Sequence, residues 1–337
     1  MPDFVVYILY AVTVGVVVFL SMKLGKYVDI IDAKSNISGA FIGAVMLAAV
    51  TSLPELFTSL SAVWIVGESS FVIGNILGSN LINLAFMGAI MLAFTKKFKF
   101  AKFSKSYYAS LFVGMGMYAL VALGLFLGQY LRIGWFTAVS PLILVLYVLF
   151  LKKLPKSAES EGEKVEDDMT LRTAVIRFII CAVLLIGTSI AMTYLTDIVA
   201  ELLKLGKTFA GALFLGIATS LPELISSITL CARGNFNASA GNFIGSNVFN
   251  FTILFVADMF SFGKAANVYV LNPESVCLLI FGEIAVIAAF CMLCIKNRTK
   301  SNGVGTLIGA QVCNAVPPVL YVLFLLLTTG VIGGFLI

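Results

Sequence analysis

The sequence contains no histidine, and charged residues make up only 12% of its 337 positions. The absence of histidine excludes histidine-ligated metal sites and histidine proton relays. Soluble domains carry about 25% charged residues, so this chain has half the usual share. Hydrophobic residues account for 60% of the sequence, and they recur in blocks about 20 residues long. This composition predicts a polytopic helical membrane protein and excludes a soluble enzyme, a disulfide scaffold, a coiled coil and a disordered chain.

The sequence has six cysteines, which lie in or beside apolar segments. Cys291 and Cys294 form a C-x-x-C pair, but no second pair and no histidine completes a zinc site. We therefore expect all six cysteines to be plain buried thiols. The amino-terminal residues lack the basic region of a signal peptide, so we interpret residues 4–22 as the first membrane span.

Ten apolar stretches are long enough to cross a bilayer, some of them with a tilt or a bend. They fall at residues 4–22, 37–66, 70–94, 107–128, 131–151, 171–200, 207–231, 236–258, 272–295 and 303–330. The most polar segment, residues 152–170, contains Pro155 and an acidic run, which we interpret as a solvated linker rather than a calcium-binding loop. This linker divides the chain into two halves, residues 1–151 and residues 171–337.

The distribution of basic residues predicts the orientation of the chain. If the amino terminus faces outward, 18 of the 22 lysine and arginine residues fall on the inner side of the membrane. Cytoplasmic loops carry the excess of positive charge in membrane proteins. We therefore expect a multi-pass protein of the cell membrane with both termini outside and the 152–170 linker in the cytoplasm.

Self-similarity is the strongest feature of the sequence. AAVTSLPEL at residues 48–56 matches GIATSLPEL at 216–224, and GNILGSNLIN at 74–83 matches GNFIGSNVFN at 241–250. Each copy lies in a half with five predicted spans, and because five is odd, the second half must enter the membrane from the opposite side. We predict an all-α polytopic membrane protein of ten transmembrane helices, arranged as two inverted-topology five-helix repeats. This architecture is typical of secondary transporters, whose sites lie near the membrane midplane.

The two motif segments, residues 48–83 and 216–250, carry matching sets of oxygen ligands. In each T-S-L-P-E the Thr, Ser and Glu share one helical face, and the proline frees backbone carbonyls about one turn earlier. The candidate ligands are Thr51, Ser52, Glu55, Ser79 and Asn83, their counterparts Thr219, Ser220, Glu223, Ser246 and Asn250, and the carbonyls near Ala48 and Gly216. An all-oxygen set of this kind suits hard cations such as Ca²⁺ or Na⁺.

Other polar residues of the predicted spans receive a structural interpretation. We expect the remaining asparagines of the motifs to hydrogen-bond between helices and the motif glycines to allow close helix approach. These residues are Asn75, Asn80, Asn242 and Asn247, and Gly74, Gly78, Gly241 and Gly245. Glu283 lies inside the ninth span without a repeat mate, and we assign it a structural role. Asp258 and Asp197 lie near span ends, where we expect them to be solvated.

The repeated blocks resemble the α-repeats of the sodium/calcium exchangers, in the cation/calcium antiporter superfamily. This resemblance implies that the candidate ligands hold the transported ions and that Ca²⁺ is exchanged for Na⁺. It also implies that the first and sixth spans slide against a core of eight helices. Some members, including the potassium-dependent exchangers, carry Asp where this chain has Asn250. Asn on both sides leaves two carboxylates in the site, which resembles the potassium-independent branch. The G-N-x-x-E form of the proton-coupled branch is absent, which favours Na⁺ over H⁺ as the coupling ion.

Three functions remain open from the sequence. A Na⁺/Ca²⁺ antiporter is favoured, and a Ca²⁺/H⁺ or other divalent-cation antiporter is the alternative, because a buried glutamate can bind a proton instead. A cation channel would use the paired carboxylates as a filter, which the inverted repeat disfavours. The sequence has no nucleophile–base pair and no cofactor motif, so we expect neither enzyme activity nor a cofactor. The expected partners are Ca²⁺, Na⁺ and the lipid bilayer, without nucleic acid, and we expect a functional monomer.

Overall fold

The computed structural model describes residues 3–34, 51–153, 169–232, 234–261, 267–298 and 304–329. Its longer helices are α1 (Asp3–Lys34), α3 (Leu53–Ser61), α4 (Ser70–Ala93), α6 (Ser106–Leu127), α7 (Val139–Lys153), α8 (Leu171–Leu202), α10 (Gly216–Ala232), α11 (Phe236–Met259), α12 (Pro273–Arg298) and α13 (Val304–Thr328). The short elements are η1 (Ala62–Val66), α5 (Thr95–Phe98), η2 (Gly128–Tyr130), β1 (Arg132–Ile133), β2 (Phe136–Thr137), α9 (Lys207–Ala210) and η3 (Gly211–Leu215).

Eight helical segments of the described residues are long and apolar enough to cross a membrane. They are Asp3–Tyr27, Ser70–Ala93, Ser106–Tyr130, Leu171–Leu202, Lys207–Ala232, Phe236–Met259, Pro273–Asn297 and Val304–Thr328. Two shorter apolar helices, Leu53–Val66 and Val139–Leu151, lie where the second and fifth spans are predicted. The chain is therefore an all-helical, multi-pass integral membrane protein. Residues 35–50 and most of the predicted linker (154–168) lie outside the described residues.

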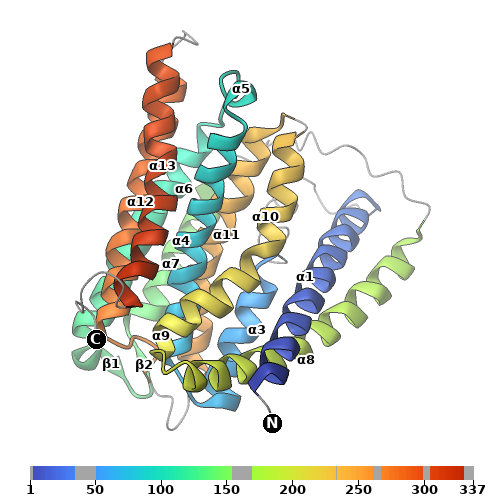
Figure 1. Cartoon of the computed structure of the whole chain (residues 1–337), viewed down its shortest axis with the longest axis vertical. Coiled ribbons are helices and arrows are strands. Elements are labelled where there is room, and N and C mark those ends of the chain that lie inside the picture. The colour runs from blue at the N-terminus through green and yellow to red at the C-terminus, as the bar shows by residue number, and fades with distance from the viewer. Residues whose placement is uncertain are drawn as a thin grey trace.

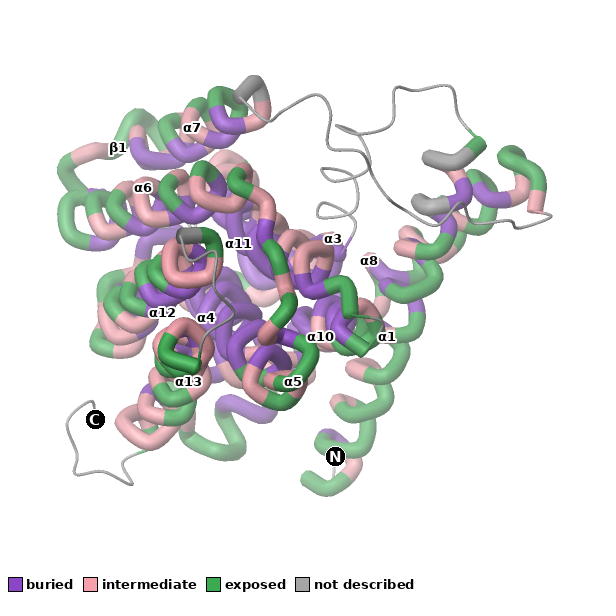
Figure 2. The backbone as a smooth tube through the Cα atoms, turned by 90° about the horizontal axis from the view of Figure 1, so that it is seen from above, coloured by how far each residue is buried: buried purple, intermediate pink, exposed green. Residues whose placement is uncertain are grey.

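Helices α4 and α11 form the centre of the bundle. Within their most apolar windows, 78% of the residues of α4 and 67% of those of α11 are buried, against 22% in α1 and 17% in α8. Viewed from above, buried residues gather on α4, α11 and the facing side of α10, and exposed residues cover the outer helices (Figure 2). The central pair consists of the two helices that carry the G-N-x-x-G-S-N-x-x-N motif.

Helices α1 and α8 form a pair at one side of the bundle and run antiparallel along each other (Figure 1). The end of α1 meets the start of α8, where Lys34 Nζ donates a hydrogen bond to Met169 O at 2.6 Å. Towards the bundle, Tyr10 on α1 donates its hydroxyl hydrogen to Phe214 O in η3 at 2.6 Å. The predicted first and sixth spans are thus partners that contact the core through few polar bonds.

Glycines allow α4 to pack directly on the backbone before α10. A β-carbon at Gly78 would lie 2.5 Å from Ala212 Cα, and one at Gly74 would overlap Thr208 O. Backbones approach this closely only where one side chain is absent. This confirms the predicted role of the two glycines of the first half. Gly241 faces instead the hydroxyl of Tyr107 on α6.

The expectation that Asp258 is solvated is wrong. Asp258 is fully buried near the end of α11, where its Oδ2 accepts hydrogen bonds from Thr137 N at 2.8 Å and from Ser140 Oγ at 2.6 Å. The β1–β2 hairpin and the start of α7 supply these donors and so cover the helix end. Asp197, the other acid expected near water, is partly exposed and forms an ion pair with Lys207 at the start of α9.

The remaining sequence expectations concern the thiols and Glu283. All six cysteines lie in the described residues and are free; Cys231 is buried, Cys291 is exposed, and the other four are intermediate. The expectation of uniformly buried thiols therefore holds only for Cys231, and it fails most clearly for Cys291, which is exposed on α12. Glu283 is half-buried on the same helix, and one of its oxygens has no hydrogen-bond partner among the described residues.

Candidate cation site

Two proline-containing segments bring the motif glutamates into the bundle. In the first, Ser52 is a turn residue, and α3 begins directly after it with Pro54 in the first turn. Proline is tolerated there because the first N–H groups of a helix lack intrahelical partners. In the second, α10 continues through Pro222. Glu55 and Glu223 are both fully buried.

The hydroxyl groups of the two motif copies meet each other across the centre of the molecule. Thr51 Oγ1 lies 3.3 Å from Ser246 Oγ, and Thr219 Oγ1 lies 3.3 Å from Ser79 Oγ. Thr51 and Thr219 are equivalent in the sequence repeat, as are Ser79 and Ser246. The threonine of each T-S-L-P-E segment therefore pairs with the serine of the other half. Ser79 Oγ also donates to Gly216 O at 3.4 Å, which places this predicted carbonyl at the same junction.

The two carboxylates lie within electrostatic reach of each other, and hydroxyls of the motifs lie beside each of them. Thr219 lies beside Glu55, and Thr51 and Ser246 lie beside Glu223. A carboxylate at the centre of a bilayer costs at least about 2.5–3.5 kcal/mol unless it is compensated. Two buried carboxylates of like charge therefore require a cation or protons.

Asparagines hold the backbone of each glutamate in place. Asn75 Nδ2 on α4 faces Glu55 O at 3.2 Å, Thr58 Oγ1 at 3.0 Å and Ser59 Oγ at 3.0 Å. The second half repeats this arrangement, in which Asn242 Nδ2 faces Glu223 O, Ser226 Oγ and Ser227 Oγ at 3.3, 3.0 and 3.1 Å. The predicted interhelical role of these asparagines is confirmed. The sequence prediction does not include their hydroxyl partners, Thr58, Ser59, Ser226 and Ser227. These hydroxyls recur between the two halves at the same spacing as the glutamates, so the repeat could have revealed them.

Four further asparagines join α4 to α11. Asn80 Nδ2 donates to Asn247 O at 3.3 Å, and Asn247 Nδ2 donates to Asn80 O at 2.9 Å. Asn83 Nδ2 donates to Asn247 Oδ1 at 3.0 Å, and Asn250 Nδ2 donates to Asn80 Oδ1 at 3.1 Å. The two central helices are therefore connected by a reciprocal network of side-chain amides.

Eight buried oxygen atoms of the predicted ligands have no hydrogen-bond partner among the residues that the structure describes. They are Ser52 Oγ, Ser220 Oγ, Asn83 Oδ1, Asn250 Oδ1 and both carboxylate oxygens of Glu55 and Glu223. Buried polar atoms normally have partners, and an unpartnered one is costly. The eight atoms come in pairs that are equivalent in the repeat, and all of them can bind a cation. Oxygen-only sets of this kind suit Ca²⁺ and Na⁺.

The predicted ligands lie on a small set of neighbouring elements. The hydroxyl, amide and carboxylate ligands predicted in both halves lie on α3, α4, α10 and α11, or in the turn that precedes α3, at the contact between these elements. The carbonyl of Gly216 lies with them. Ala48 lies outside the described residues.

Comparison with known proteins relates this chain to a family of ion exchangers. The family model described as sodium/calcium exchanger protein matches residues 5–152 and 173–330. The putative antiporter CaxA of Alkalimonas amylolytica is 28% identical over 228 residues, which cover 64% of this chain and 68% of that protein.

Two solved structures share the fold. The H⁺/Ca²⁺ exchanger CAX superimposes with a TM-score of 0.65 at 14% identity, over 96% of this chain and 88% of its own. The sodium-calcium exchanger NCX_Mj, soaked with 100 mM Na⁺ and 10 mM Sr²⁺, superimposes with a TM-score of 0.59 at 18% identity, over 94% and 98%.

Proposed function

The chain belongs to the sodium/calcium exchanger family, a family of transporters, and on this premise we propose that it exchanges Ca²⁺ for Na⁺ across the cell membrane. The observation that carries the proposal is the set of eight buried ligand oxygens, four of them the carboxylate oxygens of Glu55 and Glu223, for which the described residues supply no hydrogen-bond partner. One Ca²⁺ bound there neutralises the two carboxylates, and so do two Na⁺ ions. Because both ions need the same carboxylates, binding of one excludes the other, which enforces exchange.

The proposed architecture is ten transmembrane helices in two inverted five-helix repeats, residues 1–151 and 171–337, joined by the 152–170 linker. Its support is that α1 and α8, the first helices of the two halves, run antiparallel (Figure 1). The start of α1 and the end of α13 also lie at the same end of the bundle, as an even number of crossings requires. By the positive-inside rule, this end faces outward and the linker lies in the cytoplasm.

Alternating access then depends on the α1–α8 pair. This pair is the most exposed part of the bundle, while α4 and α11 are held together by the asparagine network. A movement of α1 and α8 past the core would expose the site to one side of the membrane and then to the other. An empty site would contain two uncompensated buried charges, which disfavours its passage through the occluded state and suppresses leak. One copy of the chain contains the whole site, so the proposed functional unit is a monomer.

A Ca²⁺/H⁺ antiporter is the second candidate. The solved H⁺/Ca²⁺ exchanger CAX has the same fold, and a buried carboxylate can release Ca²⁺ by binding a proton instead of Na⁺. The T-S-L-P-E form of both motifs, where the proton-coupled branch has G-N-x-x-E, favours Na⁺ as the coupling ion.

The test is Ca²⁺ uptake into proteoliposomes that contain the purified protein, with an outward gradient of Na⁺ or of H⁺. The proposal predicts uptake with the Na⁺ gradient and none with the H⁺ gradient alone. Uptake with only the H⁺ gradient would assign the protein to proton coupling at the same site. Uptake that is indifferent to both gradients would contradict exchange and indicate a channel.

A further inference from the structure

Asn83 and Asn250 each carry one group that binds a cation and one that repels it. The amide oxygen is a ligand for Ca²⁺ or Na⁺, while the amide NH₂ only donates hydrogen bonds. A rotation of about 180° around the last side-chain bond exchanges the two groups. An asparagine is therefore a reliable cation ligand only where something fixes the direction of its amide.

In this protein, the backbone carbonyls of Asn80 and Asn247 fix the direction of two side-chain amides. Asn80 Nδ2 lies 3.3 Å from Asn247 O, and Asn247 Nδ2 lies 2.9 Å from Asn80 O. A backbone carbonyl can only accept, so the NH₂ group of each side chain must face the carbonyl of the other residue. The Oδ1 atoms of Asn80 and Asn247 must consequently point the other way.

The oxygens of Asn80 and Asn247 in turn determine the direction of the Asn250 and Asn83 amides. Asn80 Oδ1 can only accept, and the group that faces it is Asn250 Nδ2 at 3.1 Å; Asn247 Oδ1 similarly faces Asn83 Nδ2 at 3.0 Å. The NH₂ groups of Asn83 and Asn250 are therefore used within the network. Their Oδ1 atoms are buried and have no partner among the described residues.

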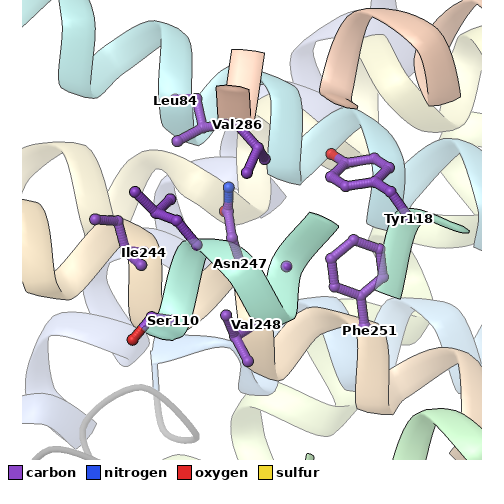
Figure 3. Close-up of a pocket in the computed structure, with 10 residues that line it drawn as sticks. Leu84, Ser110, Tyr118, Ile244, Asn247, Val248, Phe251 and Val286 are labelled. Carbon is purple, nitrogen blue, oxygen red and sulfur yellow. The ribbon is translucent and has the colours of Figure 1, made fainter. Parts of the chain in front are cut away.

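The network is buried, and the hydroxyl of Tyr118 lies beside Asn80. Asn80, Asn83 and Asn250 are fully buried, and Asn247 is 6% exposed. Asn247 lies beside a small pocket that is lined mainly by apolar side chains, among them Leu84, Ile244, Val248 and Val286 (Figure 3). Hydrogen bonds are stronger and unpaired polar groups more costly in such an environment, which favours the arrangement in which all four NH₂ groups have a partner.

We propose that Asn80 and Asn247 are positioning residues that hold the amides of Asn250 and Asn83 with both oxygens towards the ion. This rests on the proposed cation site and assigns a role to two residues outside the ligand set. It follows that the α4–α11 contact determines the ligand set as well as the stability of the core. A substitution that removes the acceptor oxygen of Asn80 or Asn247 would allow the NH₂ group of its partner to turn towards the ion.

The test compares Asn80→Ala in two backgrounds, by titration of the purified full-length protein with Ca²⁺. In the wild-type background, loss of the Asn80 acceptor releases the Asn250 amide, and we expect Ca²⁺ binding to weaken about tenfold. In an Asn250→Asp background the side chain has no NH₂ group to donate to Asn80 Oδ1 and presents an oxygen in either orientation, so a rotation only exchanges equivalent oxygens. There we expect Asn80→Ala to change the Kd by less than about twofold. Asn314→Ala, which removes a buried and hydrogen-bonded asparagine on α13, is the control and should leave the Kd unchanged.

The outcomes separate this inference from the proposed function. A wild-type protein that binds neither Ca²⁺ nor Na⁺ contradicts the proposed function, and this inference with it. Binding by the wild type, together with equal weakening by Asn80→Ala in both backgrounds, contradicts only the positioning role, because a packing defect would act in both. If Asn80→Ala does not fold, Asn247→Ala with and without Asn83→Asp gives the same comparison on the other side of the network.

Discussion

The hydroxyl groups of Thr51 and Ser246 lie 3.3 Å apart although 195 positions separate them in the sequence. The pair that is equivalent in the repeat, Thr219 and Ser79, has the same distance of 3.3 Å. Each pair joins a residue of one half to a residue of the other. The candidate site is therefore built across the two halves, and neither half contains a complete one.

Because the two threonines occupy equivalent positions, we expect the same substitution at each to have a similar effect on Ca²⁺ transport. Thr51→Ala and Thr219→Ala each remove one hydroxyl beside a buried glutamate, and we expect each to raise the KM for Ca²⁺ by a similar factor, about three- to tenfold. The measurement is the initial rate of Ca²⁺ uptake against Ca²⁺ concentration. A strong effect of one substitution and none of the other would show that the two halves do not share the site.

The bond between α1 and the core gives a prediction about the conformational change. Tyr10→Phe removes the hydrogen bond to Phe214 O, which is worth about 1 kcal/mol, or about a fivefold change in the population of this conformation. We expect the apparent KM values for Ca²⁺ at the two membrane faces to shift in opposite directions. Tyr7→Phe, on an exposed part of the same helix, is the control. Shifts in the same direction at both faces would indicate a change in the site instead.

The close contact of α4 with η3 gives a prediction about stability. Gly78→Ala places a β-carbon 2.5 Å from Ala212 Cα, and overpacking of this kind costs about 1–3 kcal/mol. We expect a fall in the Tm of the purified protein by several degrees. Gly15→Ala on α1 is the matched control, because its β-carbon meets no atom of the described residues within 4 Å. There the higher helix propensity of alanine should leave the Tm unchanged or raise it. Equal Tm values for the two variants would contradict the tight contact.

Asn250→Asp tests the charge of the site. It adds a third carboxylate, so that one Ca²⁺ no longer neutralises the site, and a further monovalent cation becomes favourable. We expect a change in the dependence of Ca²⁺ uptake on Na⁺ and K⁺ that exceeds any change in expression level. The same ion dependence in both forms would remove Asn250 from the ligand set.

The repeated motifs predict the composition of the site, but not the pairing of its residues. Glu55 and Glu223 are identified by the T-S-L-P-E repeat, and both are buried. The pairing of Thr51 with Ser246 depends on how two distant helices cross, which no local pattern of the sequence encodes. The direction of the Asn250 amide depends in turn on Asn80, a residue from the other half.

Hydropathy predicts most helices and fails at the fifth predicted span. Residues 131–151 are mostly apolar, yet a two-stranded hairpin precedes α7, which begins at Val139. Gly134 has a φ of 66°, a left-handed conformation that glycine adopts without strain, and this allows the tight turn. The donors that bind Asp258 come from this hairpin and the start of α7, so its burial is a long-range consequence that its position in the sequence does not reveal.

The central claim is that Glu55 and Glu223 together bind the transported Ca²⁺. The most direct test is Ca²⁺ binding by purified Glu55→Gln and Glu223→Gln variants, with Glu201→Gln as an exposed control for the loss of one carboxylate. Each site variant retains its shape but loses half of the negative charge that compensates Ca²⁺. We predict that both lose Ca²⁺ binding by at least a hundredfold while their Tm and elution volume stay normal, and that the control binds like the wild type. Normal Ca²⁺ binding by either folded site variant would contradict the account.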